Sequence, residues 1–82
     1  MDRYSKHISI GKLHSRVIVE DINYLCSLEG YVEKCKISKK GFAYVTMGTQ
    51  QQAKAVYNAY SGRELDGYPL TIRFIGFKNK QM

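Results

Sequence analysis

Hydrophobic and polar residues alternate in four short segments of the chain, and this alternation predicts four strands. In the first segment, Ile8 and Ile10 alternate with Ser9 and Gly11, as expected for a strand with one buried face. The predicted strands are residues 7–13, 32–37, 42–47 and 70–74. Residues 38–41 form a short connection, so we expect the second and third strands to make an antiparallel hairpin.

Two other segments repeat their hydrophobic residues at the spacing of a helix. In residues 17–28, Val19, Ile22 and Cys26 fall three and four positions apart and share one face with Leu25. Residues 50–60 bury a similar stripe that includes Ala53 and Val56. Thr49 precedes the second helix, where its hydroxyl group is suited to cap the first turn.

The start of the first helix has a rival interpretation. Residues 16–19 contain a β-branched run that favours a strand, and they could form the first strand instead. Only residues 23–29 would then remain for a helix. A helix that short would bury little apolar surface, so the longer helix is preferred.

The predicted order is strand, helix, strand, strand, helix, strand. This order is the ferredoxin-like βαββαβ arrangement, an α+β sandwich in which two helices cover one face of a four-stranded antiparallel sheet. The turn residues Asp66 and Gly67 come before Pro69, which is expected to open the last strand. We expect one domain over residues 7–76, with short flexible basic ends at residues 1–6 and 77–82.

The third predicted strand carries the side chains of greatest chemical interest. By alternation, Lys40, Phe42, Tyr44 and Thr46 point to one face, and the other face carries Ala43, Val45 and Met47. If the small and flexible residues face the helices, two aromatic rings stand in solvent. Such rings can stack on nucleobases at about 1–3 kcal/mol per base. Alternatively, they stabilise the sheet through cross-strand pairs worth about 0.2–1 kcal/mol.

Length and charge narrow the range of functions. The 82 residues allow a single domain, and the net charge of +6 favours polyanionic partners such as nucleic acid. No apolar stretch is long enough to span a bilayer, and the N-terminal residues lack the apolar core of a signal peptide. We therefore expect an intracellular protein, nuclear or cytoplasmic, with no membrane partner.

The segment Lys40–Met47, read Lys-Gly-Phe-Ala-Tyr-Val-Thr-Met, resembles the eight-residue ribonucleoprotein motif of the RNA recognition motif family and departs from it only at the last position. Residues 8–13 look like the six-residue partner motif on the first strand. Similar to the family pattern are also the spacing from Leu13 to Gly30, the segment of residues 30–32, and the later positions Ala53, Gly62, Leu65, Gly67 and Leu70. The resemblance covers about residues 7–75.

The resemblance implies single-stranded RNA binding on the open sheet face. Phe42 and Tyr44 match the stacking aromatics, and Lys40 matches the phosphate-contacting basic residue. Ser9 stands where the family usually places a third aromatic ring, so RNA binding by this domain alone is expected to be weak. Strand alternation adds four further candidates on the same face, which are Lys34, Lys36, Thr71 and Arg73.

A protein-interaction module is the alternative function, because folds of this kind serve in assembly as well as in RNA binding. The outward helix surfaces supply candidates for a partner or for self-association, namely Tyr24, Ala55, Asn58 and Ala59. Arg63 begins an Arg-Glu-Leu segment that looks like a variant of the Arg-x-Phe signature of a peptide-binding offshoot of the family, with Leu65 in place of the ring.

Enzymatic activity is the least supported interpretation. The sequence has no arrangement of nucleophile and base with supporting context, and no glycine-rich loop that would hold a phosphate. Cys26 and Cys35 form no C-x-x-C pair and have no histidine pair at zinc spacing. We therefore expect reduced core cysteines, no metal and no cofactor.

Overall fold

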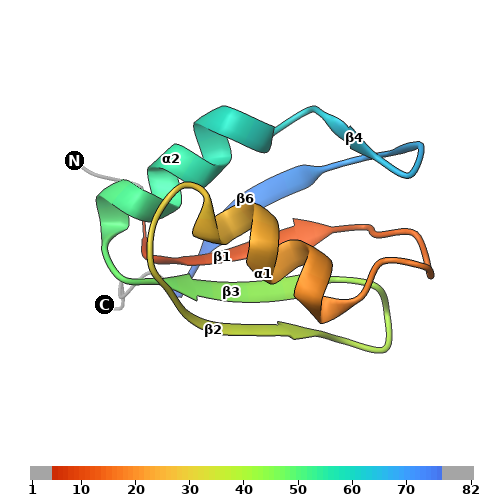
Figure 1. Cartoon of the computed structure of the whole chain (residues 1–82), viewed down its shortest axis with the longest axis horizontal. Helices are drawn as coiled ribbons and strands as arrows, with labels where there is room; N and C mark the ends of the chain where they lie inside the picture. Colours follow the sequence, from red (N-terminus) through yellow and green to blue (C-terminus); the bar gives the residue numbers. More distant parts are fainter. Residues whose placement is uncertain (1–4, 77–82) are drawn as a thin grey trace.

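The structure, a computed structural model, describes residues 5–76. Four strands form an antiparallel sheet in the order β2-β3-β1-β6, and two helices lie on one face of it (Figure 1). The sheet strands are β1 (His7–Gly11), β2 (Val32–Ile37), β3 (Ala43–Met47) and β6 (Thr71–Ile75), and the helices are α1 (Val19–Ser27) and α2 (Gln50–Tyr60). The ferredoxin-like βαββαβ fold expected from the sequence is confirmed.

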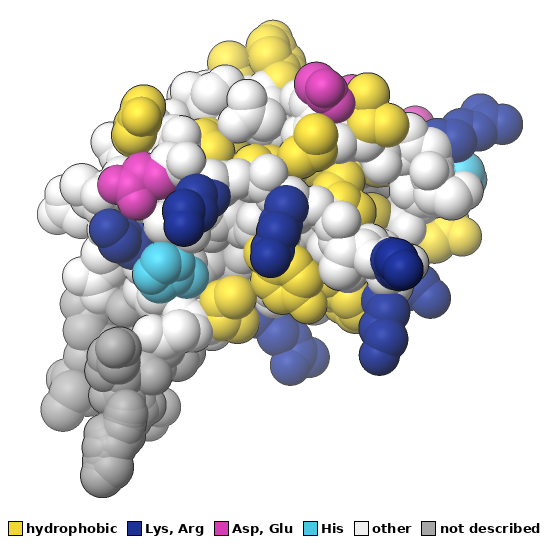
Figure 2. Space-filling view, turned by 90° about the horizontal axis from the view of Figure 1, so that it is seen from below, with side chains coloured by type: hydrophobic (Ala, Val, Ile, Leu, Met, Phe, Trp, Pro, Cys, Tyr) yellow, Lys and Arg dark blue, Asp and Glu magenta, His cyan; other side chains and the backbone are white. Residues whose placement is uncertain are grey.

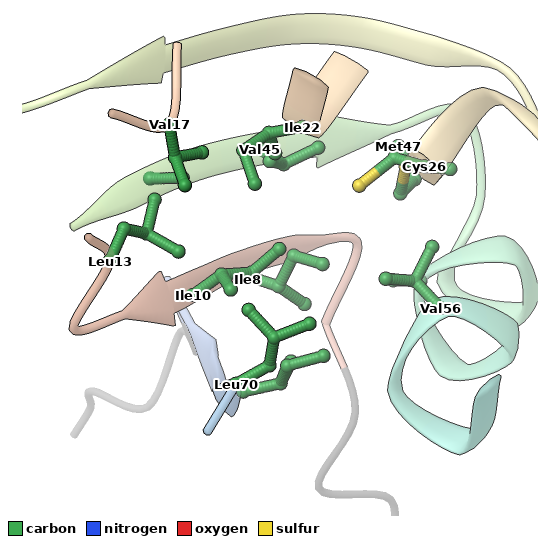
Figure 3. Close-up of a cluster of buried hydrophobic side chains, with 13 residues drawn as sticks. Ile8, Ile10, Leu13, Val17, Ile22, Cys26, Val45, Met47, Val56 and Leu70 are labelled. Atoms are coloured by element: carbon green, nitrogen blue, oxygen red, sulfur yellow. The ribbon is translucent and has the colours of Figure 1, made fainter. Parts of the chain in front are cut away.

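The hydrophobic core fills the space between the helices and the covered face of the sheet. Figure 3 shows side chains from both central strands, both helices and the loop after β1 pointing toward one another. Ile8 and Ile10 supply the core from β1, and Ile22 and Cys26 supply it from α1. The remaining buried residues are Leu13, Val17, Ala43, Val45, Met47, Ala53, Val56, Leu70 and Ile72.

The helix ends are set by local hydrogen bonds. The backbone N–H of Ile18 donates to Asp21 Oδ2 at 3.1 Å, which fixes the start of α1 at Val19 rather than at Val17. Val17 enters the core from the preceding loop. The rival strand over residues 16–19 is therefore wrong. In α2, Thr49 Oγ1 accepts from the N–H of Gln52 at 3.1 Å, which confirms the expected cap.

The last third of the chain differs most from the sequence expectation. Pro69 does not open the last strand of the sheet. It belongs to a small separate hairpin of β4 (Glu64–Leu65) and β5 (Tyr68–Pro69), in which Glu64 is its partner. Asp66 and Gly67 form the turn with positive φ angles of 53° and 84°. The backbone of Leu70 continues the pairing of this hairpin, because its N–H donates to the oxygen of Arg63 and its oxygen accepts from the N–H of Gly62 at 2.9 Å, so the sheet strand starts only at Thr71.

Other strand ends shift by one or two residues. The first strand ends at Gly11 instead of residue 13, and the third begins at Ala43 instead of Phe42. The last strand runs from Thr71 to Ile75 instead of residues 70–74. The expected basic ends fall largely outside the described residues. Within them, Lys6 is held to the domain, because its backbone oxygen accepts from the N–H of Met47 at 2.8 Å.

Both cysteines are free thiols. Cys26 is 1% exposed, and burial, with smaller contributions from Cys35 and Glu29, raises the pKa of its thiol to about 12. Cys35 is half-buried, and burial raises its pKa as well. Within residues 5–76, no three His, Cys, Asp or Glu side chains are grouped so that they could hold a metal ion. No helix in the same range is long and apolar enough to cross a membrane.

Candidate nucleic-acid interface

The sheet face opposite the helices, here called the open face, presents its side chains in rows across the strands. Tyr44 pairs with Lys36 on one side and with Ser9 on the other, and Ser9 pairs with Arg73. Residues that face each other in a ladder project to the same side of the sheet. The central row of the open face is therefore Lys36, Tyr44, Ser9 and Arg73, so an aromatic ring lies between two cations.

The second ring of the open face is Phe42, just before β3. Its partner position on β1 is Gly11, where an added Cβ would collide with the Phe42 ring. The missing side chain thus makes room for the ring to lie over the β1 backbone. Thr71 pairs with Gly11 on the other side and is exposed. Phe42 and Tyr44, on alternate positions, project to the same face, as the sequence predicted.

A second row crosses the sheet at the start of β1. His7 pairs with Thr46 and with Ile75, and its Nδ1 lies 2.9 Å from Thr46 Oγ1. These three residues, with Tyr44 and Lys36, line a hollow of about 580 Å³. The hollow combines an aromatic ring and an aliphatic side chain with hydrogen-bonding groups.

Sequence reasoning missed three residues of the open face. His7 and Gly11 have the same parity along β1 as Ser9, and Ile75 has the same parity along β6 as Arg73. The alternation that selected Ser9 and Arg73 could therefore have selected all three. The candidates taken from β1 and β6 were Ser9, Thr71 and Arg73, so the histidine at the first position of β1 and the isoleucine at the end of β6 were left out.

Lys40 does not continue the alternation of β3, which corrects the sequence expectation. It lies in the turn between β2 and β3, and Gly41 has a positive φ of 89° that interrupts the strand pattern. Lys40 lines a cleft at the end of the sheet together with Lys39 and Lys12. Its charge is still adjacent to Phe42, which lines the same cleft.

The two lysines of β2 differ in their surroundings. Lys36 lines the hollow beside Tyr44. Lys34 pairs with Thr46, on the open-face side, but it also lines a groove with Val19 and Glu20 of α1. The pairing of β2 with β3 shifts its register between Val32 and Lys34, so Lys34 lies next to this irregularity on the edge strand of the sheet.

The helix-side candidates lie away from the open face. Tyr24 on α1 is 62% exposed, Asn58 is exposed, and Ala55 and Ala59 are half-buried on α2. Arg63 is exposed in the loop after α2.

One hydroxyl ties the two helices together. Tyr60 Oη donates to the backbone oxygen of Leu25 at 3.1 Å and lies 3.3 Å from Glu29 Oε2. Burial, followed by the nearby Glu29 carboxylate, raises the pKa of Tyr60. This hydrogen bond connects α2 to α1, so the helix-side candidates lie on two helices that are joined to each other.

The charged side chains are unevenly distributed. Figure 2 shows Lys and Arg side chains across the middle of the view and at the end of the molecule away from the grey residues, around exposed hydrophobic side chains. The cleft at the end of the sheet and the hollow on the open face have no Asp or Glu among their lining residues. Both sites therefore favour an anionic ligand.

Comparisons with known proteins agree with this geometry. The profile of the RNA recognition motif family matches residues 8–71, so the chain belongs to this family. A chain of the C. elegans NONO-1 homodimer is similar in structure, with a TM-score of 0.81 and 28% sequence identity over 87% of this chain. The match covers 29% of the NONO-1 chain, so this chain spans less than a third of that protein.

The crystal structure of the RNA-binding protein PG1 is also similar, with a TM-score of 0.82 and 23% identity. The match covers 93% of this chain and all of PG1, and at this identity it supports the fold alone. No curated protein sequence matches the chain. The family membership supports RNA binding in general.

Proposed function

We propose that the open face binds single-stranded RNA by stacking bases on Tyr44 and Phe42 while basic side chains contact the phosphates. The observation that carries the proposal is the central row, in which Tyr44 lies between Lys36 and Arg73 with only Ser9 intervening. A stacked base needs a π-face, and its phosphates need nearby cations. The row places Lys36 one strand spacing from the Tyr44 position, about 4.8 Å, and Arg73 two strand spacings from it on the other side.

The hollow beside Tyr44 is the proposed location of one base. A base stacked on the Tyr44 ring would have Ile75 beside it and would direct an edge toward His7 and Thr46. The Thr46 hydroxyl can donate or accept, and the imidazole of His7 offers a second hydrogen-bonding position. The hollow therefore gives the domain a means of modest base selectivity in addition to stacking.

Ser9 limits the affinity. It occupies the central row between Tyr44 and Arg73, where a third ring would add a stacking platform worth about 1–3 kcal/mol. The domain is therefore proposed to bind RNA weakly by itself, as a binding module and not as an enzyme.

Amide chemical-shift mapping with a short mixed-sequence single-stranded RNA tests this proposal. We expect the largest shifts at open-face residues such as Ser9, Tyr44 and Arg73. Shifts confined to the helices, or no shifts, would contradict it.

Protein interaction through the helix side is the second candidate function. It is favoured by the exposed hydrophobic residues Ile18, Tyr24 and Leu28, which lie on or beside α1 and do not contribute to the core. Tyr24 and Leu28 are four residues apart, so they are neighbours on one side of the chain at this point. Measurement of the mass in solution over a range of protein concentrations tests self-association.

A further inference from the structure

The two edges of the sheet differ in how far they are covered. The strand order places β2 at one edge and β6 at the other. Just before β6, the oxygen of Leu70 accepts from the N–H of Gly62 at 2.9 Å, so the loop after α2 covers the beginning of that edge. Within residues 5–76, no strand pairs with the outer side of β2, which Figure 1 shows at the lower edge of the sheet. A bare edge of this kind can accept a further strand.

The register of β2 shows which of its backbone groups point outward. The N–H of Ser38 donates to the oxygen of Phe42 at 2.8 Å, and this pair continues the register of β2 with β3. Because hydrogen-bonded and non-bonded pairs alternate along an antiparallel ladder, Lys36 is bonded to β3, whereas Cys35 and Ile37 are not. The N–H and C=O groups of Cys35 and Ile37 therefore point away from the sheet. Within the described residues, these backbone groups make no other hydrogen bond.

A groove of about 300 Å³ lies beside this edge, between α1 and β2. Its lining residues are Val19, Glu20, Asn23, Val32, Glu33, Lys34 and Cys35. The side chain of Cys35 faces α1, with its Sγ 3.9 Å from the backbone oxygen of Val19. A strand added along β2 would place every second side chain over this groove. The side chains of Val19 and Val32 suit an apolar β-branched residue there, and the Glu20 carboxylate disfavours an acidic one.

The other side of the same edge is positively charged. Lys34 and Lys36 are exposed and lie on the open-face side of β2. The neighbouring Glu33 is already paired, because its Oε1 lies 3.5 Å from Lys6 Nζ. Opposite charges directly across a strand pair attract each other, so an added strand with acidic side chains opposite the two lysines would be stabilised.

A second copy of this chain fits the edge poorly. In an antiparallel pair that keeps the same faces together, the outward groups of Cys35 can bond to residue 33, 35 or 37 of the other copy. Each of these registers places a lysine at position 34 or 36 opposite another lysine. Like charges directly opposite destabilise a strand pair, and lysines on an edge protect against such pairing. The charge pattern therefore disfavours self-pairing and favours a partner of the opposite sign.

We propose that the outer edge of β2 binds an extended acidic segment of a partner protein, which adds an antiparallel fifth strand to the sheet. The segment alternates acidic residues with apolar ones. The backbone of the apolar residues bonds to Cys35 and Ile37, and their side chains lie over the groove. The acidic side chains lie opposite Lys34 and Lys36. The inference concerns the edge and the groove, and it does not depend on the proposed RNA binding.

The probe is the peptide acetyl-Glu-Val-Glu-Val-Glu-Val-amide, titrated into the whole chain. Hydrogen exchange of the backbone amides gives the direct readout, because the outward N–H groups of Cys35 and Ile37 exchange readily until a partner strand covers them. With the peptide at about ten times its Kd, we expect their exchange to slow about tenfold. Exchange at Lys36, whose N–H already bonds to β3, should change much less and is the internal control.

Two modified peptides test whether the backbone makes the contact. N-methylation of the valines removes the N–H groups that donate to the oxygens of Cys35 and Ile37, so the affinity should fall by about tenfold or more. N-methylation of the glutamates is the matched control, because alternate N–H groups of a strand point to opposite sides. This second peptide should bind nearly as well as the unmodified one. Equal losses for the two modified peptides would overturn the proposal.

Charge reversal tests the selection of an acidic segment. Lys34→Glu with Lys36→Glu should weaken binding of the acidic peptide about tenfold and strengthen binding of acetyl-Lys-Val-Lys-Val-Lys-Val-amide. Lys54→Glu with Arg63→Glu makes the same change of net charge on α2 and the loop after it, and it should keep the preference for the acidic peptide. Unchanged thermal melting checks that each variant is folded. Equal effects of the two variants would contradict the proposal, because the lysines would then act only through the general field.

The parent chain alone can also refute the inference. If it does not bind the acidic peptide, the edge of β2 is not a site for such a segment. Binding without slower exchange at Cys35 and Ile37 would mean that the peptide lies elsewhere, and the proposal would fail. If mixed-sequence single-stranded RNA protects these two amides and the peptide does not, the edge belongs to an RNA site instead.

Discussion

The two faces of β3 differ in burial, although their residues alternate along one strand. On the covered face, Ala43, Val45 and Met47 are at most 1% exposed. On the open face, Tyr44 is 36% exposed, although it lies between two of these buried residues in the sequence. Small and flexible apolar side chains let the helices approach the sheet closely, whereas a large ring can remain where no helix packs.

The difference in burial predicts that folding and the proposed RNA binding are separable in this domain. Side chains on the covered face contribute buried area to stability, and side chains on the open face contribute little to it. A substitution on one face should therefore change one property and leave the other nearly unaltered.

Removal of both rings of the open face should have the largest effect on RNA binding. Phe42→Ala with Tyr44→Ala removes two stacking platforms of about 1–3 kcal/mol each, so binding of an already weak site should become unmeasurable. Stability should fall only by about 0.2–1 kcal/mol per lost cross-strand pair. Fluorescence titration and chemical denaturation measure the two effects. Unfolding of the variant would show that these rings belong to the core.

Truncation of a side chain on the covered face should mainly lower the stability of the fold. Ile8→Ala leaves a cavity in the hydrophobic core and should lower the free energy of unfolding by about 2–5 kcal/mol. Ser9→Ala, one residue away on the open face, is the matched control and should stay within about 0.5 kcal/mol of the parent. Denaturant titration of both variants checks the comparison, and similar losses would contradict it.

Restoring the third ring should strengthen RNA binding. Ser9→Phe places a stacking platform beside Tyr44 in the central row, which is worth about 1–3 kcal/mol, or roughly a tenfold to hundredfold gain in affinity. Binding titrations with the same RNA measure it. An affinity equal to that of the parent would indicate that bases do not stack over Ser9.

The buried thiol on the covered face should make stability depend on alkaline pH. The pKa of Cys26 is raised from 9.0 to about 12, so the unfolded chain loses this proton at a lower pH than the folded one. The contribution is complete below pH 9 and is lost as the pH rises toward 12, and Tyr60, whose pKa is also raised, acts in the same direction. Denaturation at increasing pH should show a declining free energy of unfolding, with a smaller decline for Cys26→Ala.

Changes on the helix side should have the smallest effect on RNA binding. Tyr24→Ala with Asn58→Arg and Ala59→Arg adds bulk and charge far from the open face, so RNA affinity should stay close to that of the parent. Any self-association through the helices should be disrupted. Mass in solution and RNA titration distinguish the two results, and a large loss of RNA affinity would mean that the helix side takes part in binding.

Much of the fold follows from patterns that the sequence displays. The alternation in β1 and β3 and the helical spacing of Ile22 and Cys26 identified the elements, because burial on one side imposes a period of two on strands and about three and a half on helices. Thr49 fixed the start of α2 through a local hydrogen bond. The small hairpin of β4 and β5 was missed, because two-residue strands carry no detectable period.

The sequence by itself determined the family, the order of the elements and the face to which Tyr44 and Phe42 belong, since each depends on neighbours along the chain. Only the tertiary structure decided that Lys40 lies with Lys12 in a cleft at the end of the sheet and that His7, Thr46 and Ile75 line a hollow. These groupings join residues from different strands and loops. They are set by strand order, register and the positive φ of Gly41, and a pattern within one segment carries no information about how distant segments pair.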